Sequence, residues 1–127
     1  MEASVIQEQF KLKYGLSLEN YIEANDFDQD QVIRTWNRQK WLLEVYCRSW
    51  IHSFSYDKLT DARKVIFDDL VLEQICYFIN TFDFTTLSGL DIGTNSTIPQ
   101  NEIINRYVSP VVKEELKNRG FCFRGLW

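Results

Sequence analysis

The sequence predicts a small, mainly α-helical bundle with a long internal loop and a short extended C-terminal tail. Apolar residues recur at helical spacing through most of the chain, which is typical of amphipathic helices. Glycine, serine, threonine and asparagine interrupt this spacing between 81 and 107. The length of 127 residues, 45% of them hydrophobic, suits one domain that folds without a metal or a disulfide. We therefore expect a single helical domain over 1–127, whose residues 119–127 form an extended docking tail.

Three helices are expected in the first half of the chain. The first covers 3–13, with a partial apolar stripe, and Gly15 can end it. A second, shorter helix is expected over 18–24. A long helix over 29–54 follows the N-cap residue Asp28. Its predicted inward stripe consists of Val32, Trp36, Leu43, Tyr46, Cys47, Trp50 and Phe54.

The next helix, over 61–82, is predicted to be the central and most buried one. Thr60 is a suitable N-cap for it. Apolar residues cover nearly its whole circumference, which indicates burial on most sides. Leu72 and Ile75 in particular are expected to be inaccessible to solvent.

An irregular segment is expected from 81 to 107, in which Leu87, Leu90 and Ile92 form a short extended piece. Long irregular loops in compact domains are usually functional or mobile. We therefore expect the loop over 85–105 to contact a neighbouring copy or another partner.

The last predicted helix covers 110–118 and directs Val112 and Leu116 inward. Ser109 is a suitable N-cap, with Pro110 at the first helical position, and Gly120 can end the helix.

The tail over 121–127 alternates apolar and other residues like a short strand. We expect Phe121 and Phe123 to anchor it to the domain, while the residues beyond them reach a partner. Its arginine and tryptophan are typical interface residues. The alternative places all its apolar side chains in the chain's own core. The predicted partner-binding set is Phe123, Arg124, Leu126, Trp127, Leu90 and Ile92.

Charge and cysteine content narrow the class of function. The net charge is −4 and no segment concentrates lysine and arginine, so nothing indicates nucleic-acid binding. The three cysteines form no CxxC pair and are expected to be small buried thiols in a reducing compartment. We find neither a signal peptide nor an apolar run long enough for a membrane span. A soluble protein made in the cytoplasm is expected.

Catalytic and metal-binding patterns are weak. His52 is the only histidine, and nothing around it marks a nucleophile. Asp68 and Asp69 are adjacent on a helix, so they point about 100° apart and do not converge. The segment 91–95 lacks the spacing of a calcium-binding loop. We expect no cofactor, no metal and no enzyme, although an enzyme that uses Asp68, Asp69, Asp91 or His52 is a weaker alternative.

Four sequence pieces occur in a characteristic order in the second half of the chain. They are Leu72-Glu73-Gln74-Ile75, Gly89-Leu90-Asp91-Ile92-Gly93, Val108-Ser109-Pro110-Val111-Val112 and Gly120-Phe121-Cys122-Phe123-Arg124-Gly125. Over about residues 60–127, this order resembles the head–tail adaptor (connector, or head-completion) proteins of tailed bacteriophages. The sequence departs from the pattern at Phe123, where a tyrosine often precedes the arginine.

The resemblance implies a structural subunit of the virion neck, at the head–tail junction. Identical copies would form a ring under the portal, extend the DNA channel and present a platform for the tail or stopper protein. DNA would pass without specific binding, and no membrane would be involved. The alternative is a small phage-encoded regulator or inhibitor of a host protein. Such a regulator is usually a monomer or dimer and does not bind a portal.

Overall fold

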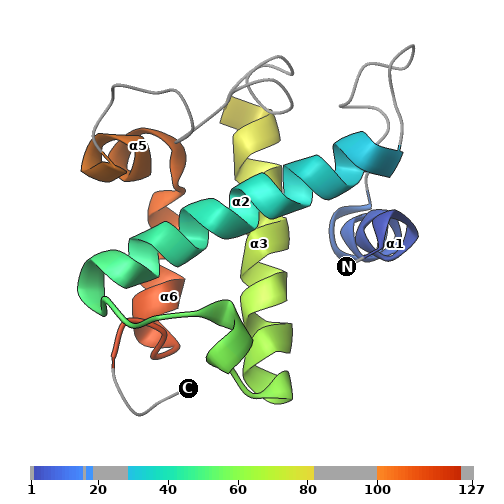
Figure 1. The fold of residues 1–127 in the computed structure, drawn as a ribbon. Helices are drawn as coiled ribbons and strands as arrows, with labels where there is room; N and C mark the ends of the chain where they lie inside the picture. Colours follow the sequence, from blue (N-terminus) through green and yellow to red (C-terminus); the bar gives the residue numbers. More distant parts are fainter. Residues whose placement is uncertain (1, 16, 19–28, 82–99, 124–127) are drawn as a thin grey trace.

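The computed structural model describes residues 2–15, 17–18, 29–81 and 100–123. All regular secondary structure in these residues is helical, which confirms the mainly α prediction (Figure 1). The helices are α1 (Ala3–Tyr14), α2 (Gln29–Trp50), the 3₁₀ helix η2 (Tyr56–Lys58), α3 (Asp61–Thr81), α5 (Gln100–Tyr107) and α6 (Pro110–Asn118).

The long helix α2 organises the bundle. It crosses α3 and also packs against α1 and α5, while α6 packs against α3 (Figure 1). One hydrophobic core receives side chains from all five of the described α-helices, from Ala3 in α1 to Cys122 after α6. The two halves of the chain are therefore packed together.

Helix α1 ends close to where the sequence predicts. Gly15 adopts a left-handed conformation (φ 68°), and its N–H donates to the Lys11 carbonyl at 2.8 Å. Ile6 and Phe10 of the predicted stripe are buried, whereas Val5, which also belongs to it, is 37% exposed. The helix expected over 18–24 lies almost entirely outside the described residues.

Helix α2 is shorter than predicted, because it ends at Trp50 and not at residue 54. The chain then turns, and the Phe54 N–H donates to the Ile51 carbonyl at 3.0 Å. Phe54 still reaches the core, but from the connection rather than from the helix. Trp50, predicted to face inward, is 55% exposed, and the Lys117 Nζ lies 4.8 Å from its ring centre. The predicted helix is too long because the apolar spacing continues through this turn.

Helix α3 has the predicted start and the predicted buried residues. The Thr60 Oγ1 accepts the Arg63 N–H at 3.3 Å, and Leu72 and Ile75 are buried. The expectation that α3 is the most buried helix is wrong, because Val65 is 68% exposed and α2 buries more residues. The buried set of α2 is Val32, Thr35, Trp36, Gln39, Leu42, Leu43, Val45, Tyr46 and Cys47.

The segment predicted to be irregular from 81 to 107 contains helix α5. Ile104 and Val108 are buried and Tyr107 is half-buried, which is a helical spacing. The prediction gave too much weight to the loop-forming residues that precede Gln100. Residues 82–99, with Leu87, Leu90 and Ile92, lie outside the described part of the chain.

Helix α6 begins and ends as predicted. The Ser109 Oγ accepts the Val112 N–H at 3.4 Å, and Val112 and Leu116 are buried. At the other end, Gly120 has a φ of 84°.

The residues after α6 form turns, so the strand-like conformation predicted for 121–127 is wrong for its described part, 121–123. The Phe121 N–H donates to the Leu116 carbonyl, and the Gly120 N–H donates to the Lys117 carbonyl, both at 3.0 Å. This paired arrangement satisfies the last helical carbonyls and reverses the chain direction. Residues 124–127 lie outside the described part of the chain.

Candidate partner-binding surface

A buried glutamine joins four helical elements at the inner face of α3. The Gln74 Oε1 accepts the Ser109 N–H at 2.9 Å. Its Nε2 donates to the Tyr107 carbonyl at 2.7 Å and to the Gln39 Oε1 at 3.1 Å. The bonds to Gln39 and Ser109 are buried and therefore form away from water, whereas the bond to the Tyr107 carbonyl is partly buried. The amide therefore ties α3 to α2, to the end of α5 and to the start of α6.

An aromatic contact ties the chain after α6 to the same helix. The Phe121 ring packs edge-on against Phe67 of α3, with the ring centres 5.4 Å apart. The Arg63 guanidinium lies 4.2 Å from the centre of the Phe121 ring and donates to the Arg119 carbonyl. Phe121 is buried, which confirms its predicted role as an anchor.

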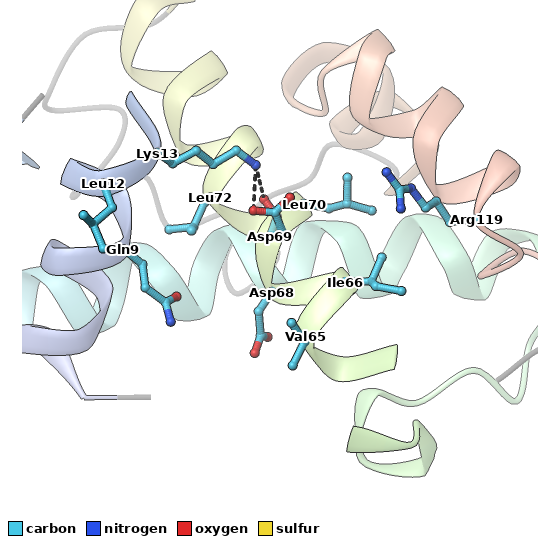
Figure 2. A pocket seen from close by; sticks show the side chains of 10 residues that line it. All are labelled: Gln9, Leu12, Lys13, Val65, Ile66, Asp68, Asp69, Leu70, Leu72 and Arg119. Carbon is cyan, nitrogen blue, oxygen red and sulfur yellow. Dashed lines mark hydrogen bonds and ion pairs between the residues drawn. The ribbon is translucent and has the colours of Figure 1, made fainter. Parts of the chain in front are cut away.

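The outer face of α3 is open and forms one side of a groove of about 570 Å³ (Figure 2). Leu70 and Leu72 are buried at the groove. Leu12 of α1 and Val65 of α3 are 78% and 68% exposed, the highest values among the described large hydrophobic residues. The groove is lined by Gln9, Leu12, Lys13, Val65, Ile66, Asp68, Asp69, Leu70, Leu72 and Arg119.

A lysine connects the two helices that border the groove. The Lys13 Nζ lies 2.7 Å from the Asp69 Oδ1 and 3.7 Å from the Glu73 Oε1, and it also donates to the Asp69 carbonyl (Figure 2). Exposed ion pairs contribute little to stability. They place the Lys13 ammonium group and the Asp69 carboxylate at this edge of the groove, with Glu73 beside Lys13 but outside the lining.

The adjacent acids Asp68 and Asp69 point in different directions, as predicted from their spacing (Figure 2). The Tyr56 hydroxyl donates to the Asp68 Oδ1 at 2.9 Å. Burial raises the pKa of Asp68, while this hydrogen bond, Lys40 and Lys64 oppose the increase. The two acids have different partners, so they do not form a paired acid–base site.

Two of the three thiols contact each other in the core. Cys47 and Cys122 are buried and free, and a hydrogen bond joins their side chains. This bond, together with burial, raises the pKa of Cys47, whereas the bond lowers the pKa of Cys122. Cys76 is only half-buried, so the prediction of buried thiols is wrong for this residue.

Phe123 is the only member of the predicted partner-binding set within the described residues, and it is 53% exposed. It does not anchor the tail, because an exposed ring contributes little packing. Leu90, Ile92, Arg124, Leu126 and Trp127 lie outside the described residues. The groove was not predicted. A signal for it exists in Leu12 and Val65, two apolar residues that lie off the inward faces of their helices.

No group of three or more His, Cys, Asp or Glu residues in the described ranges is arranged to hold a metal ion. His52 is exposed. Among the described helices, none is long and apolar enough to cross a membrane. Comparisons with known protein families, curated proteins and solved structures find no match to this chain.

Proposed function

We propose that this protein is a head–tail adaptor of a tailed bacteriophage. In this role it is a structural subunit of the virion neck. Identical copies form a ring on the portal, extend the DNA channel and hold the tail or its stopper protein. One observation carries the proposal: the described pieces of the adaptor-like sequence pattern, 72–75, 108–112 and 120–123, pack into a single unit around α3.

The contacts within this unit are specific. Gln74, in the piece 72–75, accepts a hydrogen bond from the Ser109 N–H in the piece 108–112. Phe121, in the piece 120–123, packs on Phe67, which precedes Gln74 in α3 by less than two helical turns. The bond between Gln74 and Ser109 joins two pieces that are 35 positions apart in the sequence. This supports interpreting the pattern as one structural module rather than as unrelated short matches.

The described surface favours binding over catalysis. The groove combines exposed apolar side chains with carboxylates that have separate partners, so it offers packing area rather than a paired acid and base. Trp50 and Phe123 add exposed aromatic area elsewhere. A ring requires two different surfaces on each copy, and the groove and the exposed Trp50 and Phe123 rings offer apolar area at separate places. The net charge of −4 suits a conduit that does not retain DNA.

A phage that carries an early stop codon in this gene tests the proposal. We expect cells infected with it to contain DNA-filled heads and complete tails that are not joined. Adding the purified protein to such a lysate should restore joined, infectious particles. The matched control phage carries a synonymous change at the same codon. Normal joining without the protein would contradict the adaptor role and favour the regulator alternative, under which virion assembly needs no contribution from this chain.

A further inference from the structure

The groove between α1 and α3 has the properties of a docking site for a short apolar segment. Its exposed edge residues, Leu12 and Val65, lie on two different helices and face the same space (Figure 2). Leu70 and Leu72 also line the groove and are buried. A side chain that enters the groove would cover Leu12 and Val65 without disturbing the core. Removing such apolar surface from water drives association.

The tail over 124–127, Arg-Gly-Leu-Trp, is chemically complementary to this groove. Leu126 and Trp127 supply large apolar side chains, and Arg124 supplies a cation. Lys13 lies between Asp69, which lines the groove, and Glu73, which lies beside Lys13 but outside the lining. This cluster has an excess of one negative charge, and arginine pairs well with carboxylates. On the opposite side of the groove, Arg119 is already paired with Glu115 at 3.1 Å.

The path of the described chain leads away from the copy's own groove. The Arg119 side chain lines the groove, but Cys122 is hydrogen-bonded to Cys47 of α2. In Figure 2, α2 runs behind α3, on the side away from the groove. The four residues after Phe123 span at most about 14 Å when fully extended, which limits how far the tail can turn back toward its own groove. A tail from another copy does not have to reverse this path.

We propose that the α1/α3 groove binds the Arg124–Trp127 tail of a second copy of this chain. Leu126 and Trp127 enter between Leu12 and Val65, and Arg124 pairs with the acidic edge. Groove and tail are different surfaces, so the contact is heterologous and passes from copy to copy. The inference rests on the proposed function for its ring closure, and it specifies the contact that joins neighbours.

A peptide experiment on the full-length chain tests the contact. The acceptor is the double variant Leu126→Ser with Trp127→Ser, and the probe is a synthetic peptide of residues 123–127. Methyl NMR should show saturable shifts at Leu12, Val65 and Leu72. Adding Val65→Asp to the acceptor should weaken binding at least about tenfold, which corresponds to 1.4 kcal/mol. Adding Val111→Asp is the matched control, because Val111 is 66% exposed but does not line the groove, and it should leave binding unchanged.

Absence of peptide-induced shifts, shifts outside the groove, or equal affinity of the Val65→Asp and Val111→Asp acceptors would overturn the proposal. A dilution series of the wild-type chain then identifies the donor. Groove methyl shifts should move toward those of the double variant as the protein is diluted. A difference that is zero, or constant, at every concentration would overturn the assignment to a second copy. Failure here with a positive stop-codon experiment removes the groove contact and leaves the adaptor role.

Discussion

The two faces of α3 differ in what covers them, although both are rich in apolar residues. On the inner face, Phe67 packs on Phe121, and Gln74 bonds to three neighbouring segments. On the outer face, Val65 is exposed beside the groove. An apolar circumference therefore does not show that a helix is sealed on all sides. Which face stays open depends on where α1, α2 and α6 pack.

The difference separates stability from binding. The inner face tolerates few substitutions, because a buried amide that loses its hydrogen-bond partners lowers the stability of the fold. Changing an exposed side chain on the outer face should lower the free energy of unfolding only slightly. Substitutions on the inner face should therefore unfold the protein, whereas substitutions at the groove should alter its association.

The largest effect is expected for Phe121→Ala, which removes the ring that packs between Phe67 and Arg63. Loss of a buried phenylalanine should lower the free energy of unfolding by about 3–5 kcal/mol. Urea denaturation measures the change. Phe123→Ala, at an exposed ring two residues later, is the control and should change stability by less than about 0.5 kcal/mol. Equal losses of stability in both variants would show that packing against the inner face of α3 extends beyond Phe121 to Phe123.

Gln74→Leu tests the polar joint on the same face. The variant removes the acceptor of the Ser109 N–H and the donor to the Tyr107 carbonyl. Leaving the buried Ser109 N–H unpaired costs about 1–3 kcal/mol and the partly buried Tyr107 carbonyl costs less, so we expect a total loss of about 2–4 kcal/mol in urea denaturation. Gln9→Leu, at the exposed groove edge, is the matched control and should be nearly neutral. A stable Gln74→Leu protein would contradict the importance of this joint.

Gly15→Ala perturbs the end of α1, the helix that forms one wall of the groove. Gly15 has a φ of 68° and no atom lies within 4 Å of an added Cβ, so backbone strain alone should act. We expect a loss of about 1–2 kcal/mol by thermal or urea denaturation. Gly15→Asn should lose less, since asparagine tolerates the left-handed conformation. If both variants lose the same amount, strain at this residue is not the cause.

The smallest effect concerns pH and Asp68 at the groove. Its pKa is raised by burial, so the folded chain holds this proton to a higher pH than the unfolded chain. The stabilising contribution of protonation is therefore present at low pH and is lost as pH rises through the raised pKa. Asp68→Asn should remove this decline in stability, which urea denaturation across acidic pH measures.

Tyr56→Phe provides the opposite change for the same comparison. The Tyr56 hydroxyl donates to Asp68 and lowers its pKa, so removing the hydroxyl should raise that pKa further. The decline in stability with rising pH should then become steeper and shift to higher pH. An unchanged pH profile in both variants would contradict the role assigned to burial.

Local signals at helix ends predicted much of the fold. Thr60, Ser109, Gly15 and Gly120 act at the ends where the sequence placed them, because capping depends on a few neighbouring residues. The end of α2 was missed because apolar spacing continues through the turn at Ile51. Helix α5 was missed because loop-forming residues precede it.

The candidate site was harder to predict, since it depends on how separate helices meet. Leu12 and Val65 are 53 positions apart, and nothing local indicates that α1 lies beside α3. The concentration of aromatic residues in the tail instead favours the tail as the binding segment. Gln74 was part of a recognised sequence piece, but its bonds to Tyr107 and Gln39 required the packed helices.

Electron microscopy of the chain mixed with the portal of the same phage tests the central claim most directly, that the open face of α3 joins copies into a ring. Wild-type protein and the Val111→Asp control should each add a ring of density to the portal, whereas Val65→Asp should not. The comparison is matched, since both substitutions place a carboxylate at an exposed valine. A complete ring formed by Val65→Asp would contradict the role of the groove. A bare portal with the wild-type chain would contradict the adaptor function itself.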